Sequence, residues 1–366
     1  MLTTPLAPYL HWAKTRETPL LDLAGSNLLH CTMDELPGAR EALDLSTPSG
    51  DGYQPLVQAI ADRYGTTSDR VTTAPGCSGA NFVAIAALVG AGDDVLVEQP
   101  TYDPLLGVCR LMGASIRRFS RRFDAGYAID ADEVRTLITP RTRLVIISRP
   151  HNPTGAIVPD ATLVDIGRLA AAVGAWVLVD EVYLDAANLT AEGRTGHTPA
   201  AGLDGPFIST SSLTKSYGLA GLRCGWAVAP KEISERLRRT RDLVDVVSSA
   251  PSDRLSALAF GLRDRLGERA KALLGQNTAI MRDFLAVHSQ LEVALPPRTS
   301  VTFPRLTATA DAGPFVERLL REEGVAVAPG RFFDAPAHFR ISLAGQTDVL
   351  RDGLARLGRA LARPTG

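Results

Sequence analysis

The feature of this sequence that most restricts its fold is the alternation of short apolar runs with segments of helical periodicity. The apolar runs stand at residues 94–100, 143–148, 175–181, 206–210 and 225–230. Between two of them, residues 160–173 carry apolar side chains at helical spacing, with Asp160 available as an N-cap. Strands that alternate with helices are typical of a mainly parallel sheet covered by helices. The sequence therefore predicts an α/β fold.

The last third of the chain changes character. Residues 253–292 have the pattern of one or two long helices, and three strand-like runs (VTFPRL, GVAVAP and HFRISLA) follow, with helical segments at 312–323 and 345–362. We interpret this part as a smaller α+β domain. The predicted division is an N-terminal arm (1–40) that packs on the small domain, a large domain (41–255) and a small C-terminal domain (256–366).

Composition excludes several classes of partner. The chain has 39 Lys+Arg against 40 Asp+Glu, a balance that gives no basic surface for nucleic acid. No apolar run reaches the ~18–20 residues of a membrane span, and the N-terminus lacks the pattern of a signal peptide. Four cysteines without a CxxC pair favour neither a metal site nor a disulfide framework. We expect a cytoplasmic protein that binds neither nucleic acid nor membrane, and no metal.

One lysine stands in an unusual position. The chain has only four lysines, so arginine supplies nearly all its positive charge, yet Lys215 follows an apolar run inside SSLTKSYGLAGLRCGW. Ligands of open parallel sheets bind outside the carboxyl ends of the strands. Polar residues that follow the other apolar runs or open the 79–90 helix should therefore lie near Lys215. They are Tyr102, Asn152, Asp180, Tyr183 and the turn APGCSG.

These residue types match the needs of pyridoxal phosphate, which takes a lysine for covalent attachment and a carboxylate for its pyridine nitrogen. The motifs that carry the match stand in order along the chain: PGCSG, QPTYDP, RPHNPTG, VDEVY, SSLTKSYGLAGLRCGW and FRISLA. On them, the sequence resembles the class I/II aminotransferases, fold-type I pyridoxal-phosphate enzymes of the aspartate aminotransferase superfamily. The resemblance covers residues 45–230 and 295–362. It implies a large domain with a mainly parallel seven-stranded sheet and a smaller α+β domain.

The resemblance also implies roles for the residues around the cofactor ring. Lys215 would form the Schiff base and then move a proton between substrate and cofactor. Asp180 would pair with the pyridine nitrogen. Asn152 and Tyr183 would hydrogen-bond the ring oxygen, and Tyr102 would stack on the ring.

Further residues are implied for the phosphate and the substrate. The phosphate would be held by Gly76, Cys77, Ser78, Ser212 and Arg223. Cys77 is expected to act through its backbone. Arg340, with Asn152, would bind the substrate α-carboxylate as a bidentate pair. Thr47 stands where many relatives have a tyrosine that reaches the phosphate of the neighbouring subunit, so that contact is in question.

The implied activity is transfer of an amino group between an L-amino acid and a 2-oxo acid, in a homodimer with its sites near the subunit interface. Two alternatives stay open. The same residues serve a lyase that breaks a Cβ–S or related bond, because fold and shared site do not fix the reaction. Aminotransferase-like domains also act as effector sensors in some transcription regulators. Those carry a basic winged-helix domain in front, whereas only about 45 residues precede the matching region here.

Overall fold

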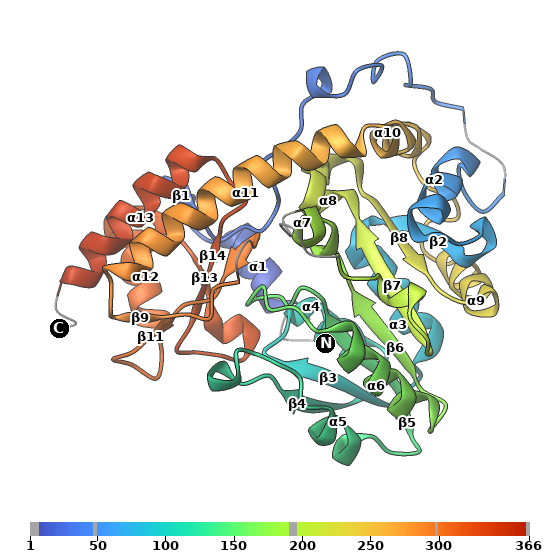
Figure 1. The fold of residues 1–366 in the computed structure, drawn as a ribbon, viewed down its shortest axis with the longest axis horizontal. Helices are drawn as coiled ribbons and strands as arrows, with labels where there is room; N and C mark the ends of the chain where they lie inside the picture. The colour runs from blue at the N-terminus through green and yellow to red at the C-terminus, as the bar shows by residue number, and fades with distance from the viewer. Residues whose placement is uncertain (1–6, 47–49, 190–195, 297–298, 364–366) are drawn as a thin grey trace.

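A mainly parallel sheet forms the centre of the protein. The structure is a computed structural model that describes residues 7–46, 50–189, 196–296 and 299–363, so Thr47 lies outside the described residues. Within them the central sheet has seven strands (Figure 1). In spatial order these are β2 (Val71–Pro75), β8 (Cys224–Val228), β7 (Phe207–Ser212), β6 (Trp176–Asp180), β5 (Thr142–Ser148), β3 (Asp94–Gln99) and β4 (Ser115–Ser120).

Strand direction and burial explain why the apolar runs could be recognised in the sequence. The pairs from β4 to β7 are parallel, and β8 runs antiparallel to both of its neighbours, β7 and β2. In β5, residues 144–147 are completely buried. A strand covered on both faces needs apolar side chains on both, which produces an unbroken apolar run. The predicted α/β fold is confirmed.

Helices cover both faces of the sheet. The α-helices between Gln54 and Arg241 are α2 (Gln54–Tyr64), α3 (Gly76–Leu88), α4 (Asp103–Leu111), α5 (Ala131–Leu137), α6 (Asp160–Ala171), α7 (Leu184–Leu189), α8 (Leu213–Tyr217) and α9 (Lys231–Arg241). Side chains alternate along β5, so Ile146 packs with α3, α4 and α9 while its neighbour Val145 packs with α5 and α6. The expected N-cap role of Asp160 is wrong, since Pro159 is the N-cap and the Asp160 carboxylate pairs with Arg149.

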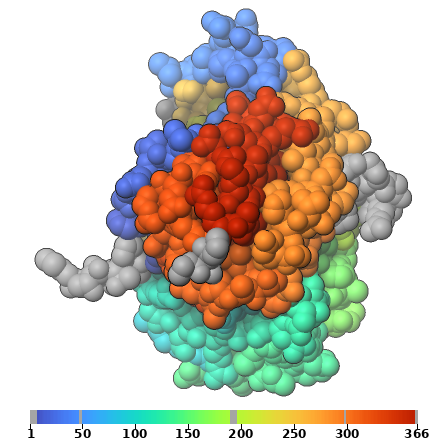
Figure 2. Space-filling model, turned by 90° about the vertical axis from the view of Figure 1, so that its left-hand side faces the viewer, coloured from blue at the N-terminus to red at the C-terminus, as the bar shows by residue number. Residues whose placement is uncertain are grey.

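The C-terminal part packs beside this sheet. It contains α10 (Ala250–Gly261), α11 (Arg263–Ala286), β9 (Leu291–Glu292), β10 (Val301–Thr302), β11 (Arg305–Leu306), α12 (Gly313–Glu323), β12 (Val325–Ala326), β13 (Ala328–Pro329), β14 (Phe339–Ser342) and α13 (Thr347–Ala362). Helix α13 packs on α11 and α12 and lies in the middle of the face seen in Figure 2. Two strand-like runs of the sequence are each split into two short strands, β10 with β11 and β12 with β13. The predicted domain boundary at 255 falls inside α10.

The N-terminal segment runs along the C-terminal part toward the centre of the molecule. It contains α1 (Pro8–Thr15) and β1 (Leu21–Asp22), and β1 pairs with β12 in parallel. The expected position of the arm is compatible with this pairing, although the domain boundaries stay a prediction. No helix among the described residues is long and apolar enough to span a membrane.

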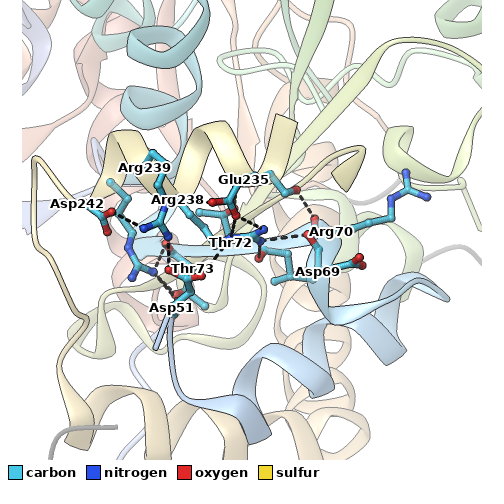
Figure 3. Close-up of polar contacts among 12 residues, drawn as sticks. Asp51, Asp69, Arg70, Thr72, Thr73, Glu235, Arg238, Arg239 and Asp242 are labelled. Carbon is cyan, nitrogen blue, oxygen red and sulfur yellow. Dashed lines mark hydrogen bonds and ion pairs between the residues drawn. The ribbon is translucent and has the colours of Figure 1, made fainter. Parts of the chain in front are cut away.

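Buried arginines join α9 to the edge of the central sheet (Figure 3). Arg241 is fully buried, and its Nη1 donates to the Thr73 hydroxyl at 2.8 Å and to the Asp51 carbonyl at 3.1 Å. Arg238 donates to the carbonyls of Asp69 and Val71. Arg241, together with Arg238, which is labelled in Figure 3, therefore reaches from α9 to β2 and to the chain ahead of α2.

We expect Arg241→Met to lower the free energy of unfolding by about 3 kcal/mol, because it leaves buried acceptors without their donor. Arg236→Met on the exposed side of the same helix is the matched control, with an expected effect within ~0.5 kcal/mol. Urea unfolding curves of the two variants measure both values. Equal effects of the two substitutions would show that the buried contacts of Arg241 contribute nothing to the free energy of unfolding.

Candidate active site

The carboxyl ends of the central strands surround a cavity of about 220 Å³. Its walls come from strand ends, from the start of α3, from α8 and from the N-terminal segment. All predicted site residues except Gly76 and Arg340 line it. The lining residues are Leu10, Ser26, Asn27, Cys77, Ser78, Tyr102, Ser148, Pro150, Asn152, Asp180, Val182, Tyr183, Ser212, Thr214, Lys215 and Arg223.

Lys215 reaches the cavity from the short helix α8. Its Nζ donates to the Asn27 side-chain oxygen at 2.6 Å and to the Ser26 hydroxyl at 2.9 Å. Burial lowers the pKa of Lys215 to about 7, and the nearby positive charge of Arg340 acts in the same direction. Near neutral pH the amine is thus half unprotonated, which is the form that attacks a carbonyl.

Asp180 stands at the carboxyl end of β6 and is 7% exposed. Its Oδ2 accepts from the Asn81 amide at 2.8 Å, while its Oδ1 accepts from the Cys77 thiol at 3.3 Å and from the Val182 N–H at 3.1 Å. Burial raises the pKa of this carboxyl, and the hydrogen bond from Asn81 is the largest effect that opposes it. A cationic ring nitrogen beside Asp180 would favour the carboxylate further.

Asn81 was not found by sequence reasoning. It lies one turn after Cys77 on α3, is buried, and accepts a hydrogen bond from Thr210 at 2.6 Å, which fixes which way its amide points. The available signal was a single amide within the otherwise apolar residues 80–89. Ser26 and Asn27 were missed for a different reason, since the N-terminal 30 residues carry none of the motifs.

The turn at the start of α3 lies against Arg223. Gly76 has φ +77°, and a Cβ there would stand 2.3 Å from Nη2 of Arg223. The helix begins at Gly76 rather than at residue 79 as predicted, so the N–H groups of residues 76–78 belong to its open first turn. Ser212 caps α8 beside this turn. A helix N-terminus, a guanidinium and a hydroxyl are therefore available here to bind an anion.

Arg340 lies behind the cavity wall and is fully buried. It donates to the Asn152 side-chain oxygen at 2.8 Å, to the Tyr9 hydroxyl at 2.6 Å and to the Ala24 carbonyl at 2.9 Å. The structure thus brings together Asn152 and Arg340, the two residues expected to bind substrate. Tyr9, from α1, is a neighbour that the sequence did not indicate.

Two phenols complete the cavity. The hydroxyl of Tyr183 is buried and makes no hydrogen bond of ordinary geometry to the described residues, and burial raises the pKa of Tyr183 to about 12. Burial also raises the pKa of Tyr102. Both phenols stay protonated at neutral pH and can donate to a ligand.

These groups fit pyridoxal phosphate, the cofactor expected from the sequence. An amine that is half neutral near pH 7, a buried carboxylate, a buried phenol and an anion-binding turn face one cavity, each suited to a different part of the molecule. Among the described residues no group of His, Cys, Asp and Glu is arranged to hold a metal ion.

Comparison with known proteins gives a consistent result. A sequence model of the family described as aminotransferase class I and II matches residues 20–357. The chain is 33% identical to a capreomycidine synthase of Streptomyces vinaceus, over 98% of this chain and 94% of the relative. It is 31% identical to a probable N-succinyldiaminopimelate aminotransferase of Mycobacterium tuberculosis, over 87% and 85%.

Solved structures show the same likeness. A PLP-dependent aminotransferase of Streptococcus suis matches with a TM-score of 0.91 and 25% identity, over 98% of each chain. The PLP-dependent cyclase OrfR matches with a TM-score of 0.86 and 27% identity, over 99% of this chain and 98% of the other.

The lowered pKa of Lys215 has a measurable consequence in the cofactor-free protein. The rate at which its amine is acylated should reach half of its maximum near pH 7 in the folded chain, and near pH ~10.4 in denaturant. The unfolded chain binds the proton more tightly, so the contribution of Lys215 to stability increases as pH rises between these values. Peptide-resolved competitive labelling measures the midpoint. Arg340→Gln should raise it, and a folded-state midpoint above pH ~9 would contradict the described environment.

Proposed function

We propose a role for each predicted site residue, starting from the premise that this chain belongs to the class I and II aminotransferase family. The chain is a pyridoxal-phosphate-dependent aminotransferase that moves an amino group between an L-amino acid and a 2-oxo acid. The observation that most supports Lys215 as its catalytic residue is the position of this amine. It lies in the same cavity as the buried carboxylate of Asp180, and the pKa of the amine is about 7.

Bound pyridoxal phosphate supplies an electron sink that makes the Cα proton of an amino acid removable. Lys215 would hold the cofactor covalently, and its amine in the neutral form would take up and return the Cα proton. Asp180 would pair with the ring nitrogen and favour its protonated form. Asn152 and Tyr183 would donate to the ring oxygen, and Tyr102 would stack on the ring.

Two separate groups of residues would hold the phosphate and the substrate. Gly76, Cys77 and Ser78 offer backbone N–H groups to the phosphate, with Ser212 and Arg223 beside them. Arg340 and Asn152 receive the substrate α-carboxylate, which orients the Cα–H bond toward Lys215. Cys77 uses its thiol as well, since that group donates to Asp180.

A second candidate is an elimination or cyclisation that starts from the same proton removal. The observation that favours it is similarity over nearly the whole chain to a capreomycidine synthase and to a PLP-dependent cyclase. The sequence match to the probable N-succinyldiaminopimelate aminotransferase covers 87% of this chain, whereas the solved structure of a PLP-dependent aminotransferase matches over 98%, so coverage alone does not separate the two reactions. Lys215 would then remove the same proton, and a group on Cβ or Cγ would leave.

We also propose that two chains form a homodimer through an apolar surface beside α10. This surface consists of Leu43, Leu45, Leu243, Val244, Val246 and Val247, all exposed, Leu45 at 86% and Leu243 at 88%. Asp44 is held at 2.8 Å by Arg254, and Ser248 donates to Asp253, so both segments are tied to the first turns of α10. Apolar side chains that gather on a surface indicate an interface.

Val246 gives the dimer proposal a further argument. Its φ of +54° is unfavourable for a β-branched residue, and Arg241 holds it there by donating to its carbonyl at 3.3 Å. The chain is therefore constrained to present this valine to the outside. A cytoplasmic location is part of the proposal, supported by four cysteines that are all free.

The reaction is tested by half-reactions with a panel of L-amino acids. We expect one equivalent of 2-oxo acid per cofactor and conversion of the cofactor to pyridoxamine phosphate, until a second oxo acid restores it. Lys215→Ala should slow turnover by at least ~10²-fold, because proton transfer loses its base. The exposed Lys231→Ala is the matched control and should be unaffected.

Two results would change the assignment. Undiminished turnover by Lys215→Ala would remove this lysine from the mechanism. Oxo acid or cyclic product beyond one equivalent, with no acceptor present and no pyridoxamine phosphate formed, would favour the elimination reaction.

The dimer is tested by sedimentation. The unsubstituted protein should sediment at twice the 39.0 kDa of one chain. Leu243→Glu should dissociate it, because a charge would be buried at the contact. Val287→Glu, at a site 76% exposed at the end of α11, should remain dimeric. A monomeric unsubstituted protein would contradict the proposal.

A further inference from the structure

Arg340 is fully enclosed, so its guanidinium is not freely available to a substrate carboxylate. Its side chain has no exposed surface, and its guanidinium lies 5.0 Å from the ring centres of both Tyr9 and Phe333. Tyr9 belongs to α1, so the N-terminal segment covers this arginine. A substrate carboxylate must therefore change something in this arrangement before it can bind.

The hydrogen bonds of the guanidinium show what must change. Arginine has five N–H donors, two of them on Nη2. Both are used, because Nη2 donates to the Tyr9 hydroxyl at 2.6 Å and to the Ala24 carbonyl at 2.9 Å. Nη1 donates to Asn152. Nε is buried and has no partner among the described residues.

A carboxylate binds arginine with two parallel hydrogen bonds, along one edge of the guanidinium. One edge is formed by Nε with Nη2, the other by Nη1 with Nη2, so each requires a hydrogen of Nη2. The unpaired Nε favours the first edge, since an unpaired buried donor destabilises the protein until a ligand satisfies it. One of the two oxygens now on Nη2 has to leave.

The Ala24 carbonyl is the less movable of the two. The residue before it is bonded on both sides, with Leu23 N donating to Ala326 at 2.9 Å and Ser342 N donating to Leu23 at 2.8 Å. The Tyr9 hydroxyl, in contrast, belongs to a side chain, which can rotate without moving the backbone. Its own donation to Ala24, at 3.0 Å, does not depend on Arg340. A turn of this side chain would free Nη2 while the backbone keeps its contacts.

We propose that the Tyr9 hydroxyl occupies the place of one substrate carboxylate oxygen on Arg340 and is displaced when the substrate binds. This inference rests on the proposed role of Arg340. The exchange replaces a neutral acceptor by a charged one and gives the unpaired Nε a partner, so the guanidinium gains a bidentate ion pair in place of a single bond to a hydroxyl. Tyr9 thereby selects for ligands that carry a carboxylate, since a neutral group on the substrate gains nothing by displacing it.

The experiment measures binding of pyruvate to the cofactor-loaded protein by calorimetry, with no amino donor and hence no turnover. Tyr9→Phe removes the internal competitor and should lower the Kd for pyruvate about tenfold. In turnover it should lower the KM for the donor and leave kcat within about twofold. Thr15→Val, which removes an exposed hydroxyl from the same helix, is the control and should leave the Kd unchanged.

A merely structural role for Tyr9 predicts the opposite sign, so a raised Kd in Tyr9→Phe overturns the inference. A second readout uses the unsubstituted protein. The Trp12 ring lies 6.1 Å from that of Tyr9, and its emission should change on binding with the same Kd, whereas Trp12→Phe loses the signal. If the Trp12 emission did not change when pyruvate binds, the inference would also be overturned. If Arg340→Gln binds pyruvate as the unsubstituted protein does, the failure lies in the proposed function itself.

Discussion

The burial of the Asp180 carboxylate at the end of β6 is the constraint on which the rest of the site depends. A buried charge needs donors, and α3 supplies two of them from successive turns, through Cys77 and Asn81. The helix must therefore begin close to the sheet. Gly225 of β8 allows this approach, since a Cβ there would lie 2.2 Å from the Gly76 backbone. The helix start that serves Asp180 thus also presents its open N–H groups to a phosphate.

The electrostatics of the cavity follow from this arrangement. Lys215 lies close enough to Arg340, behind the cavity wall, and to Arg223 that both arginines disfavour its protonated form, while Asp180 favours it. Burial exceeds the effect of the carboxylate, so the amine is half neutral near pH 7. An arginine at 215 would stay charged and could not act as the nucleophile. The chain uses arginine for nearly all its other positive charges, which is consistent with a chemical need for lysine at position 215.

The N-terminal segment connects the cofactor site to substrate recognition. Ser26 and Asn27 hold the Lys215 amine, and Tyr9 holds Arg340. The same short stretch therefore contacts the two groups that a substrate must engage, the amine it replaces and the guanidinium that receives its carboxylate. Since β1 pairs with β12, this segment is anchored to the part of the protein that carries Arg340. Substrate preference in this chain is expected to depend strongly on it.

The sequence by itself determined the α/β fold and most of the cavity. Strands buried on both faces must be apolar throughout, and the polar residues that end them meet at one rim because parallel strands point the same way. Lys215, Asp180, Asn152 and Tyr183 could be placed on that ground. Only the tertiary structure decided the partners that hold them. Asn81 meets Asp180 across 99 residues and Tyr9 meets Arg340 across 331, and such contacts leave no periodicity in the sequence because they depend on how distant elements pack.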